Sequence, residues 1–180
     1  MKTSISSLSL LLLLIGCHSC QLLDTPLPKT ELEKLPPATQ EGKGTFGCLV
    51  NGKAWFTKSY TNAGGAYQLG HLGIYGIVDI PHLSMGIDLW DIIGRPILTT
   101  GSYSLLATAP HNASASVFKS LTCMYGGSSS REDVLSGQLV ISKLDKSKYI
   151  VSGTFEFTIA HPGCDTLRIT DGRFDIPYAP

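Results

Sequence analysis

The sequence predicts an all-β protein, an antiparallel β-sandwich of about eight to ten strands, with a closed, lipocalin-like β-barrel as the alternative. Three observations lead to this prediction. Apolar and polar residues alternate in several short segments, and no segment of ten or more residues has a helical period. Glycine is frequent, at 19 of 180 residues, whereas charged residues make up only 16%. Both features favour short strands joined by tight turns.

The first 16 residues have the features of a signal peptide. Lys2 precedes an apolar stretch from Ile5 to Ile15, which is shorter than the roughly 20 residues of a membrane-spanning helix. The stretch ends in LIGC, which is similar to a bacterial lipobox, so we expect Cys17 to become the mature N-terminus and to carry a lipid anchor. Several acyl chains anchor firmly, because each buried CH₂ contributes about 0.8 kcal/mol. An ordinary signal peptide followed by a chance cysteine is the alternative.

Residues 17–44 are expected to form the lipidated N-terminus and a flexible linker. Four of the ten prolines lie there, and the segment has no sustained apolar period. A single β domain is expected to follow over residues 45–180.

The strongest local signal in this domain is Asn51-Gly52, a dipeptide that suits a type I′ hairpin turn. A two-residue loop there pairs Cys48 with Trp55 and turns both side chains toward the core. Asp171-Gly172 predicts another turn near the C-terminus. Further strands are expected at residues 67–80, 83–89, 102–106, 117–124, 135–141, 151–159 and 174–176.

Four cysteines remain once Cys17 is assigned to the anchor. An exported chain can form disulfides, and four thiols allow three pairings. The candidates are Cys48, Cys123 and Cys164, and the preferred pair is Cys123 with Cys164, since both lie near strand ends beside glycine-rich loops. Cys48, opposite Trp55, is favoured as a buried core thiol. Cys20 lies in the predicted linker.

Charge and motif content exclude several function classes. Fourteen basic residues balance fourteen acidic ones, which disfavours nucleic-acid binding. The histidine and cysteine spacings match no metal-site motif, and the glycine pairs lack the context of a phosphate-binding loop, so we expect no metal and no cofactor.

The sequence nevertheless contains two candidate functional sites. The first is a surface cluster whose members are His71, Asp79, His82, Asp88 and Asp91, in which a weak hydrolase would use Asp88 or Asp91 with His82. Solvated loop and strand residues are the favoured interpretation of this cluster. The second is a ligand cavity lined by Tyr67, Tyr75, Trp90 and Tyr103, in which a small apolar ligand or a glycan would bind.

Four sequence blocks resemble those of a family of Bacteroidota lipoproteins built around a domain of unknown function. The blocks are LPPATQEGKGTFGCLVNGKAW, GQLVISKLD, VSGTFEF and ITDGRFDI, and the resemblance extends from Leu35 to Ile176. It implies a cell-envelope lipoprotein with no assigned catalysis and no active-site residues. We therefore expect a non-catalytic protein of the outer membrane with a binding or structural role. Its expected partners are the membrane, through the lipid anchor, and a protein or a glycan.

Overall fold

The computed structural model describes residues 28–78, 82–90, 99–109, 113–127 and 130–180. It confirms an all-β fold, with eleven strands in these residues. The strands are β1 (Thr45–Val50), β2 (Lys53–Phe56), β3 (Ala63–Gln68), β4 (His71–Val78), β5 (Leu83–Trp90), β6 (Gly101–Ser104), β7 (Ala113–Ser120), β8 (Cys123–Gly126), β9 (Val134–Asp145), β10 (Ile150–Ile159) and β11 (Leu167–Ala179). The short 3-10 helices are η1 (Leu32–Lys34), η2 (Tyr60–Asn62) and η3 (Arg131–Asp133).

Within the described ranges, no helix has the length and apolar character needed to cross a membrane. The predicted signal peptide, residues 1–16, and the predicted lipidation site Cys17 lie outside the described residues, as does Cys20.

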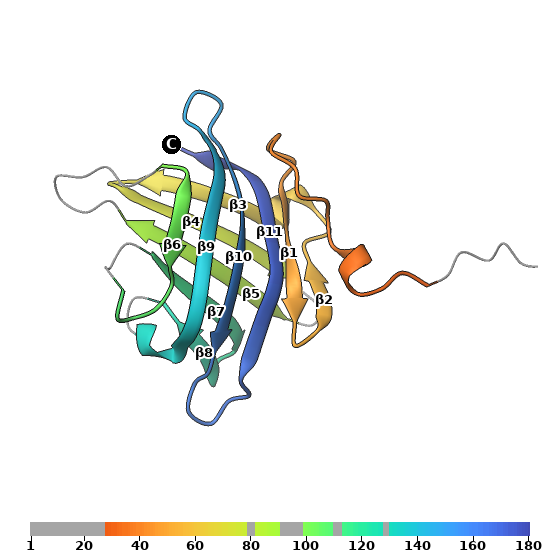
Figure 1. Cartoon of the computed structure of the whole chain (residues 1–180), viewed down its shortest axis with the longest axis vertical. Helices are drawn as coiled ribbons and strands as arrows, with labels where there is room; N and C mark the ends of the chain where they lie inside the picture. The colour runs from red at the N-terminus through yellow and green to blue at the C-terminus, as the bar shows by residue number, and fades with distance from the viewer. Residues whose placement is uncertain (1–27, 79–81, 91–98, 110–112, 128–129) are drawn as a thin grey trace, which may run out of the picture.

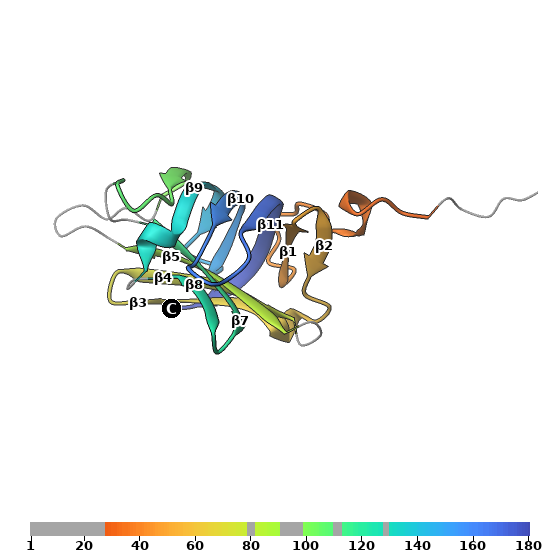
Figure 2. The same cartoon turned by 90° about the horizontal axis from the view of Figure 1, so that it is seen from below.

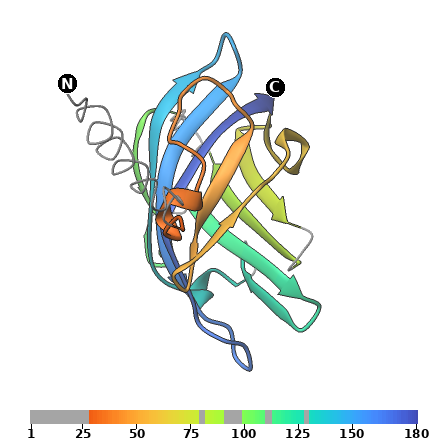
Figure 3. The same ribbon diagram turned by 90° about the vertical axis from the view of Figure 1, so that its right-hand side faces the viewer.

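The strands form two layers that face one another (Figures 1 and 2). We call the layer β2-β1-β11-β10-β9-β6 sheet A and the layer β3-β4-β5-β7-β8 sheet B. The two are joined where the end of β11 pairs in parallel with β3, at Tyr178–Gly65 and Ala179–Ala66. The other described pairings are antiparallel. The result is one curled sheet that forms a half-barrel (Figure 3). Its two layers face one another as in a sandwich, and they are continuous along one side as in a barrel.

Alternation along the strands places the core between the layers. In β5 every second residue from Leu83 to Leu89 is buried, as the sequence predicts. At the centre the ring of Phe46 packs against those of Phe155, at 5.0 Å between centroids, and Phe174, at 6.4 Å. Burial of large apolar and aromatic side chains, at roughly 25 cal/mol per Å², is the main favourable contribution to folding.

The predicted β1–β2 hairpin is present. Val50 pairs with Lys53 and Cys48 with Trp55, and Asn51 and Gly52 adopt φ angles of 48° and 78°. These are the positive values that a type I′ turn requires. Cys48 is fully buried, and burial raises the pKa of its thiol. It is a free core cysteine and not a disulfide partner.

The prediction of a turn at Asp171-Gly172 is wrong, because β11 continues through both residues. They lie at a β-bulge: the pairing of β11 with β1 shifts between Gly47–Arg173 and Leu49–Thr170, so two residues of β11 oppose one of β1. Asp171 supplies the left-handed backbone, with φ 53°. Gly172 is required for close approach, since a Cβ there would lie 2.4 Å from the carbonyl oxygen of Phe155.

The prediction of a flexible linker over residues 17–44 is wrong for residues 31–43, which are docked on the strands. Leu35 is buried, and the carboxylate of Glu31 accepts a hydrogen bond from the backbone N–H of Ala54 in β2, at 2.8 Å.

Most of the hydrogen bonds that hold this segment are made to Asp175 of β11, which is only 1% exposed. Its carboxylate accepts hydrogen bonds from the hydroxyls of Thr39 and Ser152 and from the backbone N–H groups of Glu41, Gly42 and Lys43.

This network explains why Asp175 stays ionised although it is buried. Burial alone would raise the pKa of its carboxyl, but the hydrogen bonds from Thr39, Glu41 and Ser152 outweigh that effect and lower it to about 2. Since the pKa is lower in the folded protein, the carboxylate stabilises the fold above the ordinary pKa near 3.8. That contribution is lost as the pH falls toward 2.

We predict that Asp175→Asn lowers the free energy of unfolding at pH 7 by about 3 kcal/mol, because the amide cannot accept all of these hydrogen bonds. Urea unfolding followed by tryptophan fluorescence would measure the change. The difference from wild type should shrink between pH 4 and pH 2, where Asp175 itself becomes protonated. Asp145→Asn, at an exposed turn carboxylate, is the matched control and should cost less. Equal stability of Asp175→Asn and wild type at pH 7 would contradict this account.

Candidate functional site

The structure brings three residues of the predicted clusters together on the outer face of sheet B. The Nε2 of His71 lies 2.8 Å from Oδ1 of Asp88, and the imidazole stacks on the indole of Trp90, with 5.3 Å between ring centroids and 22° between planes. His71 begins β4, and Asp88 and Trp90 lie near the end of β5. We call these three residues the outer-face triad.

Strand register explains why these side chains meet. His71 pairs directly with Trp90, and Gly73 pairs with Asp88, so all four residues share the face opposite the core. Gly73 lies beneath the contact: a Cβ there would lie 3.4 Å from Oδ1 of Asp88 and 3.7 Å from Cε1 of His71, which is ordinary van der Waals contact. The triad therefore lies over a strand position that has no side chain.

The carboxylate of Asp88 is partly withdrawn from water. Its side chain is 29% exposed, and burial raises the pKa of its carboxyl, although the hydrogen bond and charge of His71 act in the opposite direction. Ser114 of the neighbouring strand β7 pairs with Asp88, so the two side chains lie on the same face. The hydroxyl of Ser114 is buried and has no hydrogen-bond partner in the described structure. The triad thus offers an aromatic surface and a carboxylate, whereas the Ser114 hydroxyl is covered.

The hydrolase arrangement suggested by the sequence is not formed at Asp88. His82 is exposed and lies six residues before Asp88, which at about 3.3 Å per residue along an extended strand is roughly 20 Å. The histidine that contacts Asp88 is His71. Asp79 and Asp91 lie outside the described residues.

The predicted cavity of four aromatic residues is also not formed. Tyr75 pairs with Gly86 on the outer face, the same face as Trp90, and is 43% exposed. Tyr67 pairs with the buried Leu72 on the opposite face of sheet B. Tyr103 is buried in sheet A, where its hydroxyl donates a hydrogen bond to the carbonyl of Thr99. The four residues therefore point to different sides of sheet B or lie in the other layer, and they cannot line one chamber.

The outer face of sheet A has two adjoining hollows of about 490 and 390 Å³. Both are lined by Gln138 and Glu156, and their other polar lining includes Arg168 and Arg173. The aromatic side chains beside them, Phe155 and Phe157, are buried in the core. The hollows thus offer hydrogen bonds without an exposed aromatic surface.

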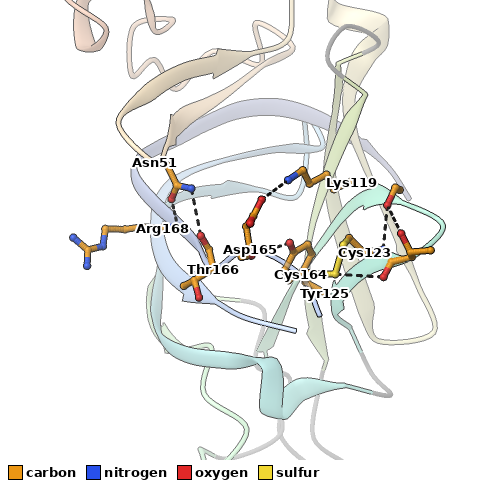
Figure 4. A network of polar contacts seen from close by, with 10 residues as sticks. Asn51, Lys119, Cys123, Tyr125, Cys164, Asp165, Thr166 and Arg168 are labelled. Carbon is orange, nitrogen blue, oxygen red and sulfur yellow. Dashed lines mark hydrogen bonds and ion pairs between the residues drawn. A yellow bond between two sulfur atoms is a disulfide. The ribbon is translucent and has the colours of Figure 1, made fainter. Parts of the chain in front are cut away.

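A disulfide and several hydrogen bonds hold the β10–β11 connection against both sheets (Figure 4). Cys123 of β8 is bonded to Cys164 with a Cα–Cα distance of 5.8 Å, which is the pairing that the sequence favours. The hydroxyl of Tyr125 donates to the carbonyl of Asp165, at 2.8 Å. On the other side, the Asn51 side-chain amide donates a hydrogen bond to the carbonyl of Thr166, at 3.3 Å, and accepts one from the N–H of Arg168 at the start of β11, at 2.7 Å. The connection therefore links β8 of sheet B to the β1–β2 turn of sheet A.

Sequence reasoning did not find a second carboxylate–imidazole pair, Asp133 with His161. Asp133 is 6% exposed, and its Oδ2 lies 2.9 Å from Nδ1 of His161 and accepts a hydrogen bond from the N–H of Gly126 at 3.0 Å. The pairing of Ile159 with Val134 brings the two residues together across the β9–β10 ladder. Their separation of 28 positions matches no motif, so only the register could have revealed them.

No group of three or more His, Cys, Asp or Glu side chains in the described ranges is placed to hold a metal ion. No protein-family model, curated protein or solved structure matches this chain. The resemblance to Bacteroidota lipoproteins therefore stays a prediction.

We predict that loss of the disulfide, in Cys123→Ser combined with Cys164→Ser, lowers the free energy of unfolding by about 4 kcal/mol on the chain-entropy model. The bridge closes a loop across a separation of 41 positions, so its removal frees a long stretch of the unfolded chain. Urea unfolding would measure the loss, and Cys20→Ser is the control. Alkylation of Cys123 and Cys164 in the native protein without reductant would show that the bridge is absent.

Proposed function

We propose that this protein is a lipid-anchored, non-catalytic β domain of the bacterial cell envelope that binds a hydroxyl-rich ligand, of the glycan class, at the outer-face triad. The proposal joins the N-terminal sequence signals, which concern location, to the triad, which concerns binding.

The proposed location rests on the sequence LIGC and the short apolar stretch before it. A cysteine at the end of such a stretch is where bacterial lipoproteins receive their diacylglycerol, and the predicted tether after Cys17 separates the domain from the bilayer. The proposed address is the outer membrane. A balanced charge of fourteen basic and fourteen acidic residues supplies no second, electrostatic attachment to anionic lipid.

The observation that carries the proposed binding role is the stack of His71 on Trp90 beside the carboxylate of Asp88. The negative face of an aromatic ring attracts the weakly positive C–H groups on one side of a sugar ring. A carboxylate accepts hydrogen bonds from sugar hydroxyls, and it has capacity for several at once. A few polar groups fixed beside an apolar surface are the usual composition of a small-ligand site.

The surroundings of the triad suit a flat ligand. Cross-strand neighbours on this face include Gly73 and Ala66, neither of which has a large side chain. A sugar ring could therefore approach the strands closely next to Trp90. A proposal of hydrolysis has no such support, because Asp88 and His82 do not meet.

We predict that Trp90→Ala weakens binding to a responsive polysaccharide about tenfold and that Asp88→Asn weakens it by at least as much. Affinity electrophoresis of the full chain carrying Cys17→Ala, in gels with amylopectin, xylan, mannan or laminarin, would measure retardation.

Two control variants make this experiment specific. Phe118→Ala alters an exposed aromatic residue elsewhere on the outer face of sheet B, and Gln138→Ala alters the hollows of sheet A. Both should bind as wild type does. Retardation that is lost in Gln138→Ala but kept in Trp90→Ala would move the site to sheet A. The absence of retardation in all four gels would count against binding of these polysaccharides.

We predict that Cys17→Ala releases the protein from the membrane fraction, because the residue that accepts the lipid is gone. Fractionation of cells followed by intact-mass measurement would show the loss of acyl mass. Cys20→Ser is the matched control and should stay in the membrane fraction. An unchanged membrane fraction for Cys17→Ala would show that the attachment is elsewhere.

A further inference from the structure

A separate hollow of about 440 Å³ lies at the β8 edge of sheet B. Phe118, Leu121, Met124, Ser130 and His161 are among its lining residues, and we call it the His161 pocket. Its volume is within the range of roughly 300–1,000 Å³ typical of ligand sites. The outer-face triad lies at the other end of the strands, since Phe118 is opposite Ser84 at the start of β5 whereas Trp90 ends it.

One side of the His161 pocket is apolar and open to solvent. Phe118 of β7 pairs with Met124 of β8, and Leu121 lies in the turn between these strands. Phe118 is 40% exposed, Met124 is 55% exposed and Leu121 is 87% exposed. Three large apolar side chains exposed on one hairpin form a patch of the kind that marks a binding surface.

The other side of the pocket ends in a hydrogen-bond acceptor. Asp133 is held in place by the N–H of Gly126, and its carboxylate contacts Nδ1 of His161. Because an ionised carboxylate only accepts hydrogen bonds, Nδ1 must carry the proton, and Nε2 of the neutral imidazole is then an acceptor. The His161 side chain is 34% exposed and lines the pocket, so a ligand there can contact the imidazole.

The pocket walls are held by covalent and hydrogen-bonded contacts. The disulfide from Cys123 fixes the start of β8 to the chain segment that follows His161. The ring of Tyr125 packs edge-on against the imidazole, with 6.3 Å between centroids, and its hydroxyl is bonded to Asp165. A site that is ordered before binding loses less conformational entropy when the ligand arrives.

We propose that the His161 pocket binds a small amphiphile whose polar head is a hydroxyl. The hydroxyl donates its hydrogen bond to Nε2 of His161, and the hydrocarbon chain lies across Phe118, Met124 and Leu121. A carboxylate head of the same length is disfavoured, because it would face the lone pair of Nε2 with the charge of Asp133 directly behind it.

The test compares 1-octanol with octanoate by ¹H–¹⁵N NMR titration of the full chain carrying Cys17→Ala. With octanol, saturable shift changes are expected at the amides of Met124, Gly126 and Ser130. Octanoate is expected to bind about tenfold more weakly, which is the effect of losing one hydrogen bond. Equal affinity for the two probes, or changes confined to other regions, would overturn the proposal.

Variants separate the two halves of the pocket. Leu121→Asp removes an 87% exposed apolar contact without touching the core, and it should weaken octanol binding about tenfold. Leu69→Asp, at a fully exposed leucine in the β3–β4 turn, is the control and should bind as wild type does. His161→Asn keeps a side-chain N–H for Asp133 and removes Nε2, so it should abolish the preference for octanol over octanoate. Octanol binding that is unchanged in Leu121→Asp, or a preference that is unchanged in a folded His161→Asn, would refute the assignment.

Discussion

The whole fold depends on β11, because one strand has to belong to both layers. Up to Pro177 it pairs with β10, and in part with β1, in sheet A, and its last residues pair with β3 of sheet B. The bulge around Asp171 and Gly172 increases the local twist, and a strongly twisted strand can leave one layer and reach the next. Asp175, near the end of the pairing in sheet A, holds the N-terminal segment in place through its buried carboxylate. The curvature of the sheet, the joining of its two layers and the docking of the N-terminal segment therefore all depend on the thirteen residues of β11.

The two proposed sites lie at different ends of sheet B. At one end the strand register gathers His71, Asp88 and Trp90 over Gly73, and the polar groups are partly shielded from water. At the other end β8 is short and forms an edge, which leaves Phe118 and Met124 exposed beside the Asp133–His161 pair. An edge strand exposes unpaired backbone groups that could pair with another chain, and the disulfide from Cys123 ties this edge to the body of the protein.

Local patterns were sufficient to predict the features that depend on neighbouring residues. The Asn51-Gly52 hairpin and the alternation of β5 depend on backbone preference and on side-chain period, and both are legible in a few positions. Asp-Gly at 171 was misread because a left-handed residue followed by glycine suits a bulge as well as a turn. The triad was only partly predictable, since its residue types stood out but the partner of Asp88 depends on the β4–β5 register. The Asp175 network and the Asp133–His161 pair join residues that are far apart in the chain, and no local signal marks them.

With the proposed anchor at Cys17, the docked N-terminal segment would have a mechanical consequence. Any tension on the tether would reach the domain at Glu31 and Leu35 and then at the hydrogen bonds around Asp175, before it reached a strand of the core. The eleven Cα–Cα steps from Cys17 to Pro28, at about 3.5 Å each, would span at most roughly 40 Å. Force applied through this tether would therefore detach residues 31–43 first. Loss of their contacts would absorb the force before the strands of the sheet separated.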